Sequence, residues 1–346
     1  MFDLSRALPP ANGVGLKGLP AAARAVGLIA GAIRQMSMDA WSGDVKLPRP
    51  HLLEKPDRIA NTGRAWWIGT QVEDYLWHGN AVHVVTHRDE DGWPDSVQWV
   101  PAENVSISAD GDGLPVYWID GEPVRNQADV VHVRRGAARG APWRGVGVLE
   151  QHLAAADKLM KQAQAESDGY DQSGVPSVVI VAPNKDLSQE EADRAKDSWM
   201  EKFRRRVPAV MPAGTEVKPL SWSPSDAQMV EAHQASLQDV ANMFGLDGSY
   251  LGASLKGMAY KSLGRQFLQL VRETIDPITD DFEQVWSEAW FGWPLYDKVI
   301  RFDKSEYLAD DPATETPWLV SAVDAGIIST DEARVRLGFP SRKDGL

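Results

Sequence analysis

The sequence from 223 to 245 reads SPSDAQMVEAHQASLQDVANMFG, and this stretch decides the architecture. One set of residues in it recurs every three or four positions, as on one face of an amphipathic helix. The set comprises Val230, His233, Leu237, Val240 and Phe244. Asp226, Glu231 and Asp239 fall between them. We predict a helix that packs along this stripe, keeps the three acids in water and ends at Gly245.

A loop and a longer helix follow this first helix. Residues 246–259 hold three glycines and show no strong period, which is typical of a mobile connection. Periodicity resumes at Leu263, and Pro277 predicts a kink because its ring removes a backbone donor and clashes with the preceding turn. The apolar stripe of this helix comprises Phe267, Leu270, Val271, Ile278, Phe282, Val285, Trp286 and Ala289.

Short motifs follow one another in order from about residue 60 to about residue 340. They are Gly79–His83, Pro101 with Val105, Asp129–Val133, Val240–Leu246, Tyr250–Gly252, Tyr260, the run from Phe267 through Pro277 to Phe282 and Glu283, and Ser329–Arg334 with Leu337 and Gly338. Together they resemble the portal proteins of tailed bacteriophages, the HK97-like group. The chain departs from that pattern at Leu246-Asp247, where the family often has a proline, and it is too short for a large C-terminal crown.

The resemblance implies an α+β fold that is portal-like and predominantly helical. It implies a wing with a β-sheet, two stem helices flanking a small β-α-β clip domain, a long kinked helix and a short helical crown. The expected units are a flexible N-terminal arm (1–20), the N-terminal wing (21–147), the first stem helix (148–174), the clip domain (175–224), the second stem helix (225–245), a tunnel loop (246–262), the long wing helix with its return strand (263–308) and the crown (309–346).

The clip unit is also visible in the residues themselves. Val178–Val181 is a predicted strand, Ser188 and Glu191 form a capping box for a helix that runs to about Arg206, and residues 216–222 return as extended chain. The end of that helix carries a basic cluster in an acidic protein, made of Lys202, Arg204, Arg205 and Arg206. The cluster either solvates a helix terminus or docks a partner.

The N-terminal half predicts helices and a small antiparallel sheet. Residues 21–32 are apolar enough to suggest a signal-peptide core, but the run is short and a surface or packing helix is favoured. A helix from Gly63 to His78 is expected to end at Gly79-Asn80, before strands that turn at Asp91-Gly92. A helix from Val148 to Gln172 follows, and the residues expected to pack subunits together are Leu149, Leu153 and Leu237.

Composition limits the functional classes. The chain has 346 residues, which favours two or more packed units. Its formal charge of -13 argues against a protein that grips nucleic acid over its whole surface, and its lack of cysteine excludes disulfides and thiolate metal sites. It has 14 tryptophans, a residue enriched in buried interface anchors, and no stretch approaches the roughly 20 apolar residues of a membrane span.

Three apparent sites do not form a convincing centre. His78, His83 and His87 are close in sequence, but strand residues four apart lie too far from each other to share one ion unaided. Asp110 and Asp112 lack the glutamate of a calcium loop. Residues 145–147 (Gly-Val-Gly) open a helix without the lysine of a phosphate loop, so a tight turn is favoured. We predict no catalytic residue, no metal and no cofactor.

The function that the resemblance implies is a portal. This is a ring, dodecameric in the family, at one capsid vertex of the virion, assembled in the host cytoplasm. Its expected partners are further copies of the chain, the large terminase, a head–tail adaptor protein, the major capsid protein and double-stranded DNA that passes without sequence-specific contacts, with no membrane. Two alternatives are an enzyme of unrecognised type that uses the His83 region and a monomeric α+β adaptor.

Charge along the second stem helix suggests how DNA passes. No lysine or arginine occurs between Lys218 and Lys256, whereas four acids do. Asp226, Glu231 and Asp239 are therefore expected to line a channel that repels phosphate. Basic residues return at Lys256, Lys261 and Arg265, which either solvate the loop or form one narrow ring of positive charge.

Overall fold

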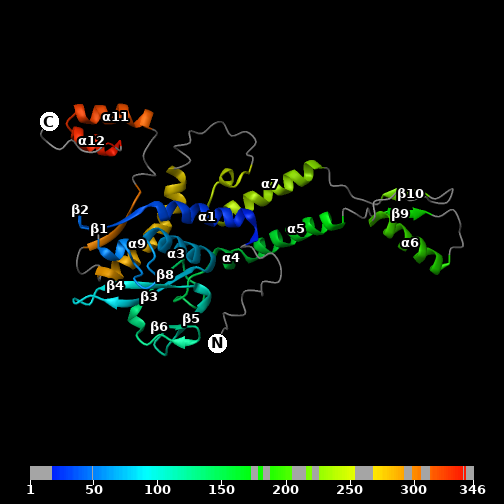
Figure 1. Cartoon of the computed structure of the whole chain (residues 1–346), viewed down its shortest axis with the longest axis horizontal. Helices are drawn as coiled ribbons and strands as arrows, with labels where there is room; N and C mark the ends of the chain where they lie inside the picture. Colours follow the sequence, from blue (N-terminus) through cyan, green and yellow to red (C-terminus); the bar gives the residue numbers. More distant parts are fainter. Residues whose placement is uncertain are drawn as a thin grey trace.

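The computed structural model describes residues 18–48, 50–172, 178–181, 188–204, 216–219, 226–253, 268–291, 298–304, 312–337 and 339. Three helices from distant parts of this chain form the centre of the molecule: α1 (Pro20–Gln35), α3 (Arg64–His78) and α9 (Asp276–Phe291) (Figure 1). Large side chains meet between α3 and α9, with the rings of Trp67 and Trp286 4.9 Å apart and both fully buried.

The structure confirms α1 as a packing helix. Seven of its residues are buried, and they recur on the face that contacts α3 and α7 (Asp226–Met243). The predicted helix before Gly79 is confirmed as α3, and Gly79 ends it with a φ of 75° in the left-handed region that favours glycine. No helix in the described part of the chain has the length and apolar character of a membrane span.

The predicted single antiparallel sheet is two sheets. β3 (Asn80–Arg88) pairs antiparallel with both β4 (Pro94–Val100) and β8 (Val130–Arg134), in the order β4-β3-β8. A separate sheet has the order β5-β6-β7, formed by Val105–Ala109, Pro115–Ile119 and Glu122–Pro123. A short 3-10 turn, η3 (Ala102–Asn104), follows Pro101 and redirects the chain between the sheets, which the strand pattern alone does not reveal.

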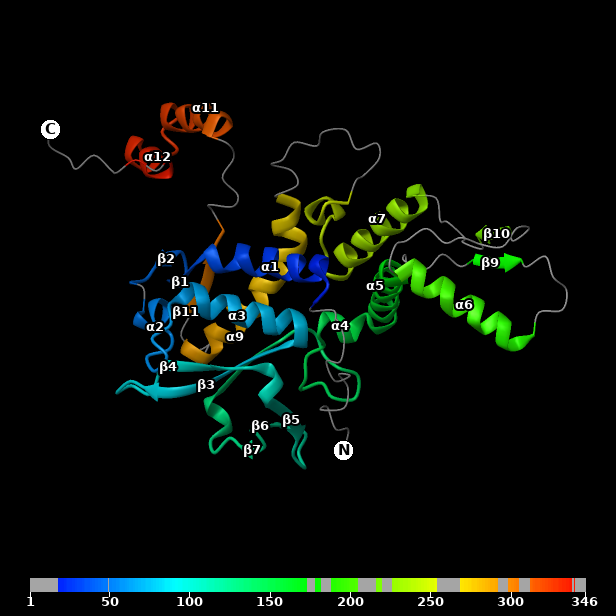
Figure 2. The ribbon, with the colours of Figure 1, turned by 45° about the vertical axis from the view of Figure 1, so that its right-hand side comes forward.

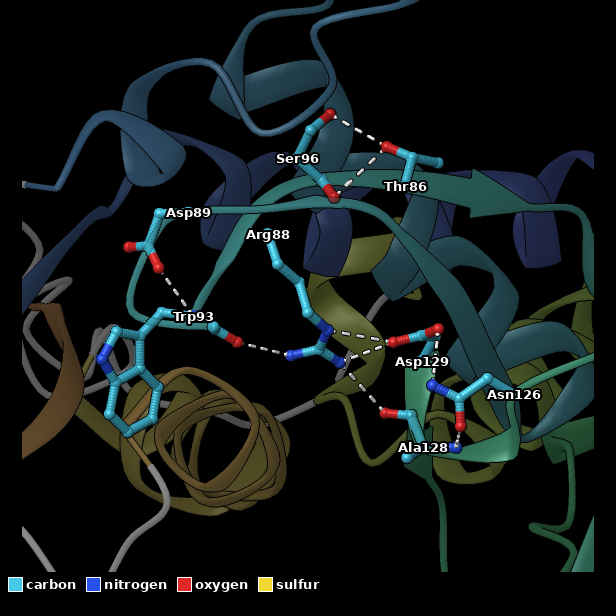
Figure 3. Close-up of polar contacts among 9 residues, drawn as sticks. Thr86, Arg88, Asp89, Trp93, Ser96, Asn126, Ala128 and Asp129 are labelled. Atoms are coloured by element: carbon cyan, nitrogen blue, oxygen red, sulfur yellow. Dashed lines mark hydrogen bonds and ion pairs between the residues drawn. The ribbon is translucent and has the colours of Figure 1, made fainter.

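The hairpin between β3 and β4 is fastened to the start of β8. Figure 3 shows the Arg88 guanidinium donating to Asp129 Oδ1 at 2.7 Å and to the Gly92 carbonyl at 3.0 Å. The Asp89 carboxylate accepts the Trp93 amide at 2.8 Å, which closes the predicted Asp91-Gly92 turn. One arginine thus ties the tip of the hairpin to η4 (Gln127–Asp129).

A third sheet joins the two ends of the wing. β1 (Ser37–Ser42) pairs antiparallel with β11 (Lys298–Asp303) and with β2 (Val45–Lys46). Ser287 and Glu283 of α9 accept the β11 amides of Ile300 and Phe302, both at 2.8 Å. The return strand expected after the long helix is confirmed as β11. After β2 the chain forms α2 (His51–Glu54), whose Leu52 and Leu53 are buried.

Two helices project from the wing and lead to the clip unit (Figures 1 and 2). The predicted helix from Val148 to Gln172 is α4 (Val148–Gln151) and α5 (Leu153–Gln172), with the chain bent at His152. Beyond the far end of α5 and α7 lie β9 (Val178–Val181), α6 (Gln189–Arg204) and β10 (Glu216–Pro219). The two strands pair antiparallel, with Val179 opposite Lys218.

The segment after α7 is more ordered than its composition suggests. Gly245 ends α7 with a φ of 68°, as predicted. The chain then makes a 3-10 turn, η5 (Gly248–Leu251), in which Leu246 and Leu251 are buried, so this half of the expected mobile loop packs on the core. A π-helical segment, η6 (Val271–Ile275), lies directly before Pro277, which is where a helix irregularity was expected.

The C-terminal part is a helical hairpin. α11 (Pro312–Asp324) and α12 (Thr330–Arg336) lie at the opposite end of the molecule from the clip unit in both views. Ser329 caps α12 in a capping box with Glu332. The α+β class, predominantly helical with small antiparallel sheets, is therefore confirmed.

Candidate functional site

The stem helices α5 and α7 are held together by polar contacts along their length. Ser236 Oγ donates to Gln162 Oε1 at 3.0 Å, and Lys158 Nζ lies 3.1 Å from Asp239 Oδ2. The side chains of this ion pair are 68% and 40% exposed, so it contributes no more than about 1 kcal/mol. In the described part of the two helices, apolar side chains such as Leu159 and Phe244 are buried as well.

The three acids assigned to a channel lining occupy different surroundings. Glu231 is exposed on α7. Asp239 forms an ion pair with Lys158 on the other stem helix. The absence of Lys and Arg between Lys218 and Lys256 does not take this cation into account, because it lies in another segment of the sequence. Asp226 begins α7, but its side chain lies outside the described residues.

The apolar residues assigned to subunit packing differ in how exposed their side chains are. Leu149 is half-buried and packs against the core of its own chain, and Leu237 is half-buried on α7. Leu153 is 59% exposed at the start of α5. Of the three, Leu153 presents the most apolar surface to a neighbouring molecule.

The remaining basic candidates fall mostly outside the described residues. Lys202 and Arg204 lie in the last turn of α6, whereas Arg205 and Arg206 follow its end. Lys256, Lys261 and Arg265 also lie outside the described ranges.

The stem begins at a crossing of two backbones. A Cβ atom placed on Gly79 would overlap the backbone of Val146, one on Gly145 would overlap the Gly79 carbonyl, and one on Gly147 would overlap the Trp77 carbonyl. Arg135 N donates to Gly79 O at 2.9 Å, and Val146 N donates to Arg135 O at the same distance. These glycines therefore let the end of α3 pass directly over the chain that enters α4, in agreement with the tight turn favoured from the sequence.

Asn80 fastens this crossing. Its Oδ1 accepts from Gly145 N at 2.8 Å and lies 3.0 Å from His132 Nε2, while its Nδ2 donates to His78 O at 2.7 Å. His132 Nδ1 in turn lies 3.1 Å from the Tyr117 hydroxyl. Burial lowers the pKa of His132 to about 3, with Arg134 adding to the effect, so the ring is neutral with its proton on Nε2, facing Asn80.

A second network connects the same crossing to α9. The Tyr75 hydroxyl donates to Asp281 Oδ2 at 2.5 Å, and Arg135 donates to the Val146 carbonyl at 3.0 Å and to Gln151 Oε1 at 2.6 Å. Burial raises the pKa of the Asp281 carboxyl, and the hydrogen bond from Tyr75 opposes that rise. Buried and half-buried polar groups on β3, β8, α3 and α9, together with Arg135, therefore surround the point where the chain enters α4.

Sequence reasoning assigned no function to Asn80 and read it as part of a helix stop. The signal that distinguishes its role is the combination of Gly79-Asn80 with the Gly-Val-Gly run at 145–147. These two motifs can be read together only once the structure shows that residues 79–80 contact residues 145–147.

The three histidines considered for a metal do not converge. His83 is fully buried, its ring centroid 5.3 Å from that of Trp67 and 5.2 Å from that of Trp286, and neither ring nitrogen has a hydrogen-bond partner in the described structure. His78 lies 3.6 Å from Glu103, and His87 lies 3.1 Å from Asp95. Within the described residues, no group of three or more His, Cys, Asp or Glu side chains is arranged to hold a metal ion.

Solved structures are similar to this fold over most of the chain. An HK97 family phage portal protein from Corynebacterium diphtheriae is 18% identical, with a TM-score of 0.66 over 84% of this chain and 95% of that one. A chain from the neck of an empty gene transfer agent particle, determined with C6 symmetry, is 21% identical, with a TM-score of 0.66 over 95% of this chain and 92% of that one.

The neck of the native gene transfer agent particle, determined with C12 symmetry, contains a chain that is 22% identical with a TM-score of 0.64, over 95% of this chain and 92% of that one. No curated protein matches the chain in sequence. The fold is therefore that of the vertex proteins of tailed phages and related particles.

The chain belongs to the phage portal protein family, whose model matches residues 20–338. This is a structural family of the capsid vertex, and a role in DNA packaging follows from membership. The resemblance inferred from the motifs is confirmed.

Proposed function

We propose that the chain forms a closed ring of twelve copies at one capsid vertex, and that double-stranded DNA passes along the axis of this ring. The observation that carries the proposal is Leu153, a large apolar side chain that is 59% exposed at the base of a projecting stem. One chain leaves this surface open, and a heterologous contact that closes on itself buries it in every copy. The gene transfer agent neck determined with C12 symmetry supports the count of twelve.

The proposal gives each segment a place in the ring. Residues 148–174 and 225–245 form the stem, 175–224 the clip, 246–262 a loop near the DNA and 309–346 a small crown. The wing, formed by residues 21–147 and 263–308, faces the major capsid protein. The large terminase and later a head–tail adaptor dock on the clip, where Lys202, Arg204, Arg205 and Arg206 supply positive charge at the rim.

The proposal also describes how DNA moves without sticking. Asp226, Glu231 and Asp239 face the channel and repel phosphate, and Lys158 partly offsets the last of them. Lys256, Lys261 and Arg265 form one narrow basic ring on the tunnel loop, so that counterion release and binding are confined to one level. Motion needs no chemistry from this chain, which acts without catalysis or cofactor inside a virion assembled in the host cytoplasm.

Light scattering of purified protein tests the assembly. The wild-type chain is expected to elute as a ring, and Leu153→Asp with Leu237→Asp as a monomer, because each interface would then bury two uncompensated charges. Ile59→Asp, at a residue 72% exposed in a wing loop, is the matched control and should leave rings intact.

Circular dichroism must show that the double variant is folded before its size is interpreted. Rings of unchanged size after both substitutions would show that Leu153 and Leu237 are not part of the interface between copies. A monomeric wild-type protein would favour the alternative of an α+β adaptor. Catalytic turnover that depends on the His83 region would favour the alternative of an enzyme.

A further inference from the structure

An apolar groove lies at the base of the stem. It is separate from the surfaces assigned above to DNA and to the clip partners, but it shares Leu153 with the surface proposed for contact between copies in the ring. It has a volume of about 630 Å³ and lies between the end of α3, strand β5 and helix α4. Its apolar lining includes Trp77, Val105, Ile107, Leu149 and Leu153. Acidic side chains of Glu103 and Asp120 border the same groove, and a third acid of the lining, Glu150, is paired with the lining residue Arg144 at 2.6 Å. An apolar channel with acidic borders fits an apolar peptide that carries a positive charge.

One wall of the groove is an edge strand. β5 hydrogen-bonds to β6 on one side, and in the described part of the chain no strand pairs with its other edge. Val105 and Ile107, two positions apart on β5, both line the groove, as expected for side chains on one face of a strand. An extended peptide that added to this edge would place alternate side chains in the groove.

The N-terminal arm enters the described structure beside this groove. In Figures 1 and 2 the start of α1 lies next to α4 and the start of α5. Arg24 of α1 donates to the Tyr250 carbonyl at 2.9 Å, and Phe244 at the end of α7 meets the ring of Trp77, a groove residue, at 5.7 Å. A few side chains therefore separate the beginning of α1 from the groove.

The arm has a suitable length and sequence. Seventeen residues precede Gly18, and the ten residues after Leu8 span up to about 35 Å. Phe2 and Leu4 alternate with Asp3 and Ser5, which is the period of an extended strand.

Two further features of the arm match the groove. Arg6 carries the charge opposite to that of the acidic border. Pro9 and Pro10 end the segment, since proline cannot continue a paired strand. We propose that residues 2–8 of the chain's own arm add to the edge of β5, with the apolar side chains of Phe2, Leu4 and Leu8 in the groove.

Disulfide trapping in the full-length chain tests this placement. The chain contains no cysteine, so introduced pairs are unambiguous. Leu4→Cys is paired with Ile107→Cys, on the face of β5 that lines the groove, and Asn12→Cys with Ile107→Cys serves as the control for a tethered but undocked residue. Mild oxidation is followed over time on denaturing gels, where a bond within one chain changes mobility without doubling the mass.

The expected result is faster bonding within one chain at Leu4 than at Asn12, by about tenfold, because docking raises the local concentration of the bound segment only. Adding Phe2→Asp and Leu8→Asp to the Leu4 pair should slow its bonding about tenfold, since both charges would enter the groove. Ser5→Asp, on the opposite side of the extended segment, should leave the rate unchanged.

Equal rates at Leu4 and Asn12, insensitive to the aspartates, would show a tether that does not dock and would overturn the proposal. Bonds formed only between chains would also overturn it, because a second copy would then occupy the groove. Ring size measured on the same samples separates these outcomes from a failure of the ring itself.

Discussion

The root of the stem and its projecting part are built on different interactions. At the root, Gly79 and Gly145 bring two backbones into contact, and the Asn80 side chain satisfies groups on both. Where α5 and α7 leave the root, an exposed ion pair joins Lys158 to Asp239 beside the buried side chains of Leu159 and Val240. Enclosed polar contacts specify one geometry, whereas exposed charges remain available to other molecules. We therefore expect substitutions at the root to affect folding, and substitutions along the stem and clip to affect partners and DNA.

The largest effect is expected from Gly145→Ala. The added Cβ would overlap backbone at the Gly79 carbonyl, so the crossing must open at a cost of about 3 kcal/mol in the free energy of unfolding. Gly27→Ala is the control, because an added Cβ meets nothing there and helix propensity should raise stability by about 0.5–1 kcal/mol. Chemical denaturation measures both. If Gly145→Ala has wild-type stability, the close backbone contact between Gly145 and Gly79 does not stabilise the root of the stem.

A smaller effect, restricted to acid, is expected at His83. Burial lowers its pKa from 6.5 to about 3, so between these values the unfolded chain binds a proton that the folded chain does not. Stability contributed by the neutral ring is therefore present above pH 6.5 and is lost as the pH falls toward 3. At about pH 5 the loss is on the order of 2 kcal/mol.

His83→Phe should remove this part of the acid sensitivity, and at neutral pH it should not destabilise, because neither ring nitrogen has a described hydrogen-bond partner. The measurement is the denaturation midpoint between about pH 5 and pH 7.5 at fixed protein concentration. His233→Gln, at an exposed position on α7, is the control. An acid slope equal to that of the wild type would show that His83 is not held neutral.

At the clip, substitution should change docking and leave folding intact. Arg204, Arg205 and Arg206 changed to Glu should weaken capture of the adaptor protein by about tenfold, because reversed rim charges slow encounter and misorient the partner. Arg194→Glu with Lys196→Glu reverses two exposed charges earlier on α6 and should have little effect. Pull-down of the adaptor by intact rings at moderate salt measures this effect. Equal capture by the wild type and both variants would show that the arginines only solvate the helix end.

The smallest effect is expected along the stem. Asp226, Glu231 and Asp239 changed to Lys should leave ring size unchanged and slow packaging or ejection about two- to fivefold, most strongly at low salt where screening is weak. Asp239→Lys alone also breaks the pair with Lys158, so the single variant separates the ion pair from the lining charge. Glu288→Lys, exposed on the wing helix α9, is the control. Wild-type rates at every salt concentration would contradict a low-friction lining.

Local patterns predicted the helices well because their apolar faces were periodic. The stripe through Phe282 and Trp286 is buried as expected, and Ser329 caps α12. What the patterns missed depends on contacts between distant segments. Residues 37–46 carry little strand signal and become strands because β11 supplies partners, while Lys158 alters the charge near Asp239 from another helix.

The same limit applies to the candidate site. Gly145 and Gly147 were correctly read as a tight turn, but nothing near them in sequence indicates that Gly79 and Asn80 lie against them. The loop after Gly245 looked mobile from its glycines, yet Leu246 and Leu251 anchor its first half in the core. The composition of a segment shows which conformations it can adopt, and its contacts with distant residues determine which of them it adopts.

The pairing of β1 with β11 also orders events during synthesis. Ser37 lies opposite Asp303, so the first strand of the chain waits for one that leaves the ribosome after the stem and clip have been made. Closing so long a loop is slow compared with forming local helices. A nascent chain halted before Lys298 would leave the β1 backbone amides that face β11 open to hydrogen exchange. A complete β11-β1-β2 sheet therefore indicates that the whole segment from α4 to α7 has already been synthesised.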